Sequence, residues 1–168
     1  GFPVYFAQGQ NFWRSDGVLG GTTEKVVTND FSTAVTQLTQ VVTSVGPRLF
    51  FEVNSQLWVS DGSGPGTTPL LTDDATPMPL NGPSALTRGN GEFFFAATGA
   101  SNIGKELWRF DAATGKATLV SDINSPRDAG SDPQHLTAVG DKLYFTADDG
   151  ISGRELWVTE GGFGFNDT

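Results

Sequence analysis

Short runs of apolar residues alternate along the chain with clusters of Gly, Asp, Asn and Ser. In residues 49–53, 93–97 and 143–147, alternate positions fall on opposite faces, and both faces carry apolar or aromatic side chains. A period of two predicts β-strands, and apolar residues on both faces predict that another layer of the protein packs against each side of these strands. The short, turn-rich connections exclude a parallel sheet, so we expect antiparallel strands packed between neighbouring sheets.

A tryptophan motif repeats four times and contains every Trp of the chain. Trp13, Trp58, Trp108 and Trp157 are separated by 45, 50 and 49 residues. A second motif repeats with it, ahead of each Trp, at residues 1–6, 46–51, 90–95 and 140–145. Repeats in this range of length indicate stacked supersecondary units, and the blades of a β-propeller fit them best. We therefore expect the tryptophans to occupy equivalent, largely buried positions.

The fourth repeat shows the strands of one unit most fully. Residues 132–139, 143–147 and 155–159 are expected strands, and 148–153 forms a hairpin loop. A further strand follows the Trp motif at 67–71 and 117–120. The prediction is an all-β propeller with about three and a half to four blades of four antiparallel strands, part of a larger propeller. Its blades span approximately residues 1–30, 31–74, 75–124 and 125–168.

The repeats resemble a family of secreted proteins whose units contain Glu-Leu-Trp-x-x-Asp-Gly-Thr. The motifs at 56–62 and 155–161 match it best, and 136–150 matches the other half of the unit. Asp111-Ala112 replaces Asp-Gly in the third repeat, and Phe12 replaces Leu in the first. The resemblance implies propeller-like repeats and secretion or surface display, and it implies no settled activity.

Both ends of the chain fall inside a unit. Unit one begins at its second strand, and we expect unit four to lack its last strand. Because soluble proteins rarely leave such apolar faces open, a companion polypeptide or an oligomer mate should complete the propeller. We favour the companion, since it would supply the last strand of unit four. The tail 162–166, which alternates Gly and Phe, is a candidate donated strand.

Composition narrows the function classes. The net charge of −9 and the scattered Lys and Arg argue against a nucleic-acid partner. No apolar stretch is long enough for a membrane helix. Low Lys and high Thr, Ser, Gly and Asp suit a secreted, extracellular β protein, and Asn166 begins a glycosylation sequon.

Candidate sites lie in the longer loops, because loops on a rigid scaffold carry function disproportionately. We favour the interpretation that these loops are solvated hairpins over the interpretation that they bind a ligand. For the loops rich in Asp, calcium binding is an alternative to turn formation. His135 is the only His, and no nucleophile motif accompanies it, so we assign no catalytic residue. The ligand-binding candidates are Ser101, Asn102, Lys105, Asp148, Asp149 and Arg154, and the metal candidates are Asp122, Asn124, Asp128 and Asp132.

The leading hypothesis is a non-enzymatic extracellular binding module that recognises a glycan or a protein through propeller loops, as lectins do. The alternative is a structural subunit of an extracellular assembly or fibre, completed by another chain. A carboxylate-based hydrolase ranks third, because paired carboxylates cannot be recognised from sequence alone.

Overall fold

The computed structural model describes residues 3–27, 31–43, 46–72, 81–89, 92–99, 103–125, 129–160 and 164–166. Over these residues the chain is all-β, and its neighbouring strands pair antiparallel. No helix long and apolar enough to cross a membrane occurs in the described part of the chain. The predicted all-β, antiparallel architecture is therefore confirmed.

In the part of the chain that the structure describes, fifteen strands follow one another in four groups, which we call units one to four. Unit one contains β1 (Val4–Gln8), β2 (Asn11–Ser15) and β3 (Thr23–Lys25), and unit two contains β4 (Thr36–Thr43), β5 (Gly46–Val53), β6 (Gln56–Ser60) and β7 (Thr67–Pro69). Unit three contains β8 (Asn81–Gly89), β9 (Glu92–Thr98), β10 (Lys105–Asp111) and β11 (Lys116–Ser121). Unit four contains β12 (Gln134–Val139), β13 (Lys142–Asp148), β14 (Arg154–Glu160) and β15 (Gly164–Asn166).

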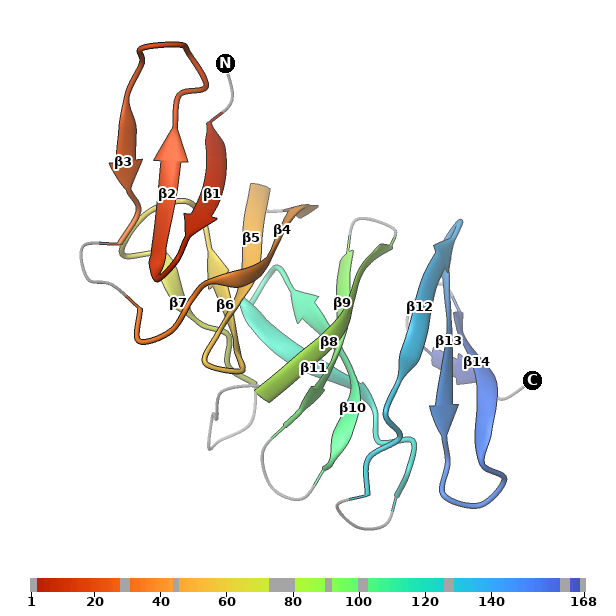
Figure 1. Ribbon diagram of the computed structural model, residues 1–168. Helices are drawn as coiled ribbons and strands as arrows, with labels where there is room; N and C mark the ends of the chain where they lie inside the picture. Colours follow the sequence, from red (N-terminus) through yellow and green to blue (C-terminus); the bar gives the residue numbers. More distant parts are fainter. Residues whose placement is uncertain are drawn as a thin grey trace.

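Within each unit the strands pair in chain order. Units one and four each form a separate sheet, whereas units two and three are joined into one eight-stranded sheet through β6 and β8. That junction is narrow, since it consists of the single pair Gln56 and Asn81. Figure 1 shows the units following one another, with units one and four at opposite ends.

The last strand of unit four is present, so the prediction that the chain lacks it is wrong. β15 pairs antiparallel with β14, and Val158, Thr159 and Glu160 lie opposite Asn166, Phe165 and Gly164. The Gly- and Phe-rich tail thus supplies the last strand of its own unit.

The tryptophans occupy equivalent places in their units, as predicted. Each Trp lies opposite an aromatic residue of the preceding strand, in the pairs Phe6–Trp13, Phe51–Trp58, Phe95–Trp108 and Phe145–Trp157. Their burial differs, however: Trp108 is buried, whereas the other three are half-buried. The indole Nε1 of Trp108 donates to the carbonyl of Ala97 at 2.9 Å, and the backbone of Gly99 lies against its ring.

A bulge at the same place marks the first strand of units two, three and four. The pairing shifts there, and one residue adopts a positive φ of 54°, 53° or 56°. Two residues later a Thr hydroxyl donates back to the carbonyl of the bulged residue, at 3.3, 3.1 and 3.0 Å. The bulged residues are Gln37, Ala85 and His135, and the threonines are Thr39, Thr87 and Thr137. Gln37 and Ala85 occupy the equivalent position in units two and three. The backbone conformation of His135 therefore reflects the geometry of the strand.

Strand β1 corresponds to the second strand of the other units, as the alignment of the repeats predicted, and the described residues of unit one contain no such bulge. In the described residues, β1 pairs with β2 alone. The core consists of three apolar clusters, one between each two successive units. At the junction between units two and three, the rings of Phe50 and Phe93 stack with their centroids 4.0 Å apart.

Candidate functional site

Two connections on successive units lie side by side and enclose an open depression. One is the β11–β12 connection, and the other is the β13–β14 hairpin; the volume of the depression is about 510 Å³. Its walls bring together residues from both sequence-derived groups: Asp148 and Arg154 from the ligand candidates, and Asn124 and Asp132 from the metal candidates. The remaining lining residues are Ala129, Gly130, Gly150, Ile151 and Gly153.

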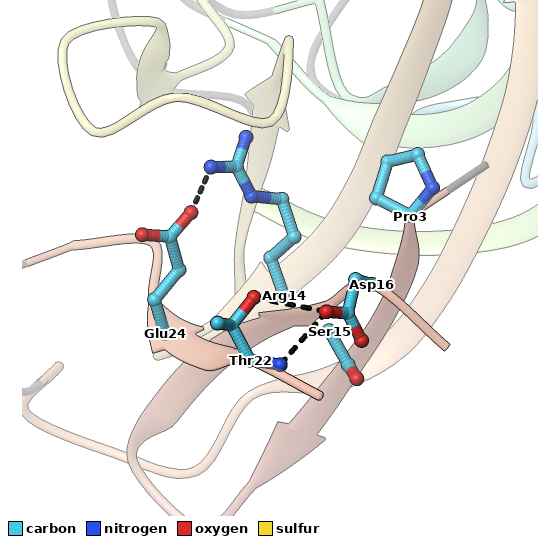
Figure 2. A pocket seen from close by; sticks show the side chains of 6 residues that line it. All are labelled: Pro3, Arg14, Ser15, Asp16, Thr22 and Glu24. Carbon is cyan, nitrogen blue, oxygen red and sulfur yellow. Dashed lines mark hydrogen bonds and ion pairs between the residues drawn. The ribbon is translucent and has the colours of Figure 1, made fainter. Parts of the chain in front are cut away.

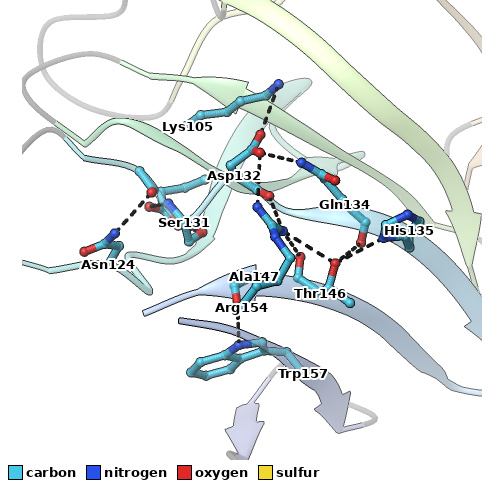
Figure 3. A network of polar contacts seen from close by, with 12 residues as sticks. Lys105, Asn124, Ser131, Asp132, Gln134, His135, Thr146, Ala147, Arg154 and Trp157 are labelled. Carbon is cyan, nitrogen blue, oxygen red and sulfur yellow. Dashed lines mark hydrogen bonds and ion pairs between the residues drawn. The ribbon is translucent and has the colours of Figure 1, made fainter. Parts of the chain in front are cut away.

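Asp132 is the hub of the polar contacts at this depression (Figure 3). Its carboxylate pairs with Arg154 at 3.2 Å and with Lys105 at 3.6 Å, and it accepts a hydrogen bond from Gln134 at 2.5 Å. Its backbone has a positive φ of 44°, which Asp tolerates better than most residues. The carboxylate is therefore held in place by two cations that come from different units.

Arg154, the first residue of β14, links the second and third strands of unit four to the connection from unit three. Its guanidinium donates to the backbone carbonyl of Asp132 at 3.0 Å and to that of Thr146 at 3.3 Å. Lys105, at the start of β10, extends the contacts into unit three. These three ligand and metal candidates are thus brought together across one junction between units.

Asp148 and Asp149 shape the hairpin beside the depression. Asp148 accepts from the backbone of Gly150 at 2.8 Å, and Asp149 accepts from Ile151 and Ser152 at 2.8 and 2.7 Å. The backbone donors of Ser152 and Ile151 lower the pKa of Asp149 below its ordinary value. Turn formation therefore accounts for much of the acidic character of this loop, and it favours the charged form of Asp149.

The metal candidates are only partly gathered. Asn124 donates to the carbonyl of Gly130 at 3.2 Å, and Asp132 is already balanced by two cations. Among the described residues, no group of three or more His, Cys, Asp and Glu could hold a metal ion. Asp122 follows β11 outside the depression's lining, and Asp128 lies outside the described residues. Calcium binding stays a prediction.

Three other candidates lie wholly or partly beyond the described residues. Ser101 and Asn102 belong to the β9–β10 loop and are among the residues that are not described. Asn166 is the last residue of β15, and the rest of its sequon falls outside. Ligand contacts at Ser101 and Asn102, and glycosylation at Asn166, remain predictions.

Sequence reasoning missed Glu106, the first residue of the third Trp motif. Its side chain is completely buried and accepts hydrogen bonds from the backbone of Ser131 at 2.7 Å, from the Ser131 hydroxyl, and from the backbone of Ile123 at 3.3 Å. Burial raises the pKa of this carboxyl above its ordinary value. Glu106 fastens both ends of the β11–β12 connection and thereby fixes one wall of the depression.

A second, smaller depression lies in unit one, beside the β2–β3 turn (Figure 2). Asp16 accepts from the backbones of Val18 and Thr22, and Arg14 pairs with Glu24. The hydrogen bonds from Thr22 and Val18 lower the pKa of Asp16. Because Asp16 comes from the Asp-Gly of the repeat motif, we assign these contacts to turn formation.

Comparisons with known proteins found similarity to solved structures alone. No protein-family model matches the chain, and no curated protein matches it. A crystal structure of puromycin hydrolase is similar, with 15% sequence identity and a TM-score of 0.47. The similarity covers 99% of this chain and 30% of that one, so the chain spans about a third of that protein's length.

Proposed function

We propose that the four units are blades of a β-propeller and that they belong with the Glu-Leu-Trp-x-x-Asp-Gly-Thr repeats of secreted proteins. Three features support this: four strands in chain order in each of units two to four, the same bulge in their first strands, and an apolar cluster at every junction. Such regular stacking of small sheets is typical of propellers.

On this scaffold, the chain acts as an extracellular, non-enzymatic binding module for a glycan or a protein ligand. The observation that carries the proposal is the depression between units three and four. It combines acceptors and donors, from Asp132, Asp148, Asn124 and Arg154, with the nearly fully exposed side chain of Ile151. Carboxylates, an amide and a guanidinium suit the hydroxyl groups of a sugar, and an apolar side chain suits the face of its ring.

A carboxylate-based hydrolase stays in third place. Asp132 is held by ion pairs, and Asp148 and Asp149 accept bonds from their own turn. A general acid or base needs a carboxyl that is available to the substrate and has a suitable pKa. The lowered pKa of Asp149 suits a permanent acceptor better than an acid.

A glycan array followed by calorimetry tests the binding function. We expect Ile151→Ser and Asp148→Asn each to weaken binding of the recognised sugar by about tenfold, or about 1.4 kcal/mol. Leu19→Ser is the matched control, because Leu19 is also a highly exposed aliphatic residue, in a turn of unit one. Absence of binding to any sugar would remove the lectin version. Binding that neither variant weakens would place the ligand elsewhere.

The structural-subunit alternative also has an observation in its favour. Val4 and Phe6 in unit one and Leu156 in unit four are exposed at positions that are buried in the other units. Exposed apolar faces of this kind favour association with another chain. Sedimentation of the purified protein tests it: a stable monomer of 17.8 kDa would contradict it.

A further inference from the structure

One buried residue, Ser131, joins the two walls of the depression between units three and four. It lies between Gly130 and Asp132, which line the depression, but it is itself completely buried and is not part of the lining. Its backbone carbonyl accepts a hydrogen bond from the backbone N–H of Asp148 at 2.9 Å. Asp148 is the last residue of β13 and lines the opposite wall. Ser131 therefore ties the β11–β12 connection directly to the β13–β14 hairpin.

Glu106, the second residue of β10, holds Ser131 from the side of unit three. Its carboxylate accepts hydrogen bonds from the backbone N–H of Ser131 at 2.7 Å and from the Ser131 hydroxyl. The N–H of Ser131 thus binds unit three, and its carbonyl binds the hairpin of unit four. Bonds in such a chain depend on one another, because the residue that they share has one position.

The backbone of Lys105, next to Glu106, holds the residues on either side of Ser131. The carbonyl of Lys105 accepts from the backbone N–H of Asp132 at 3.0 Å. Gly130 has a positive φ of 63°, and a Cβ there would lie 2.3 Å from the backbone nitrogen of Lys105. Only Gly allows the two backbones to approach so closely. The start of β10 therefore holds residues 130–132 as one short segment.

Packing alone does not account for a carboxyl at position 106. Burial of a carboxyl is costly unless hydrogen bonds satisfy it. Among the described residues, every hydrogen bond to the Glu106 carboxylate comes from the β11–β12 connection, two from Ser131 and one from the backbone of Ile123. This side chain is therefore the point at which the connection is fastened to unit three.

We propose that Glu106 is a positioning residue for the ligand-binding depression and that it acts on Asp148 through Ser131. Glu106 fixes Ser131 against β10, and Ser131 fixes the backbone of Asp148, whose side chain lines the depression. Glu106 is not part of the lining, so it affects the ligand only through these two residues. The proposal rests on the proposed binding function, whereas the positioning itself can be measured without a ligand.

Hydrogen exchange of single backbone amides, followed by NMR, measures the positioning. In Glu106→Ala the carbonyl of Ser131 is still present but is no longer held, so the amide of Asp148 should open more often. The amide of Leu70, which donates to the carbonyl of Leu57 at 2.8 Å in unit two, reports any general loss of stability. We expect the protection of Asp148 to fall by about tenfold relative to that of Leu70.

Calorimetry with the sugar identified on the glycan array measures the effect on binding. Glu106→Ala should weaken binding by about tenfold. Glu106→Gln should weaken it less, because an amide oxygen can still accept from the N–H of Ser131. Leu57→Ala is the matched control: Leu57 is also completely buried, but it lies at the junction between units two and three. That variant loses stability without disturbing Ser131, so it should bind the sugar like the wild type.

A milder variant keeps the test available if Glu106→Ala does not fold, which circular dichroism and urea melts establish first. Ser131→Ala removes only the hydroxyl that donates to Glu106. It should lower the protection of Asp148 relative to Leu70 by about threefold, as expected for the loss of one hydrogen bond.

Each result decides the proposal. An unchanged ratio of Asp148 to Leu70 protection in the folded variant overturns the positioning role. Equal losses of affinity in Glu106→Ala and Leu57→Ala would show general destabilisation and overturn it too, as would changed exchange with unchanged affinity. If the wild type binds no sugar, the binding function fails, and the exchange of the Asp148 amide still decides whether Glu106 positions the depression.

Discussion

Removing the carboxyl of Glu106 should destabilise the protein through the connection between units three and four. In Glu106→Ala, the backbone N–H and the hydroxyl of Ser131 lose their acceptor. Ser131 is itself completely buried, so water cannot easily replace that acceptor. An unsatisfied buried donor costs about 1–3 kcal/mol, so two donors should cost about 2–6 kcal/mol. The third donor, the backbone of Ile123, forms the longest of the bonds and adds less.

Glu155 provides a matched control for this variant. It occupies the same motif position in unit four, where its side chain is half-buried. Glu155→Ala should change the free energy of unfolding by no more than about 0.5–1 kcal/mol, as most partly exposed substitutions do. Urea melts of the two variants measure both values. A cost below about 1 kcal/mol for Glu106→Ala would refute the role assigned to the buried carboxyl.

The pH dependence of Glu106→Gln tests the same carboxyl in another way. Burial raises the pKa of Glu106 above the ordinary value of 4.5, so the folded state binds this proton more tightly than the unfolded state. The contribution to stability is present below about pH 4.5 and is lost as the pH rises through the folded pKa. Gln cannot titrate, so the free energy of unfolding of the wild type relative to Glu106→Gln should fall with rising pH.

The comparison with Glu106→Gln also removes the effect of other carboxyls. Asp16, Asp61 and Asp149 have lowered pKa values because hydrogen bonds in their turns favour the charged form. Their stabilisation is lost as the pH falls, which is opposite in sign to the effect of Glu106. They are present in both proteins and cancel in the difference. If the free energy of unfolding of the wild type relative to Glu106→Gln rose with pH instead, the hydrogen bonds to the carboxylate would outweigh the effect of its burial.

Four further outcomes follow from the structure. Leu107→Ala should cost about 2–5 kcal/mol of unfolding free energy, and Leu156→Ala, measured on the monomer, less than about 1 kcal/mol; equal values would contradict the difference in burial. Trp108→Ala should cost about 3–5 kcal/mol in urea melts, and a value below about 1 kcal/mol would refute its place in the core. Asp132→Asn should cost less than about 1 kcal/mol, because its pairs with Arg154 and Lys105 are partly exposed; a larger loss would show a structural role. Calorimetry with calcium after chelation should give at most one or two sites, and four equal sites would indicate a site in every repeat.

The strands and their pairing could be predicted from sequence because aromatic residues mark them. Each unit places a Phe and a Trp at fixed positions in consecutive strands, and these pairs face one another in all four units. The bulges were not predicted, although a signal was present. Leu38-Thr39, Leu86-Thr87 and Leu136-Thr137 repeat in the three first strands, and the Thr of each pair bonds back to the bulged residue. A recurring Thr can be interpreted as a hydrogen bond to the backbone only when the irregular pairing of its strand is already known.

The candidate site was harder to predict because it depends on contacts between distant segments. Asp132 and Arg154 are 22 residues apart, and nothing in the local sequence indicates that they pair. Glu106 and Ser131 are 25 residues apart, and the motif alone does not show what the Glu binds. Asp148 and Asp149 were selected for their chemistry, and much of that chemistry proves to serve their own hairpin. Turn-forming and ligand-binding residues have the same composition, so only geometry separates them.

The depression lies where the units differ from one another, and not at a position that is the same in every unit. The second and third strands of units one and two are joined through the two-residue turns Gly9–Gln10 and Asn54–Ser55, whereas residues 149–153 form the longer turn of unit four. Only a longer turn can reach the connection arriving from unit three, which Glu106 holds in place. The apolar positions are nearly interchangeable between units because packing requires the same shape at every junction. Ligand selectivity should therefore depend on the connections that differ, and exchanging residues 149–153 for the turn Asn54–Ser55 should remove binding while the sheets remain folded.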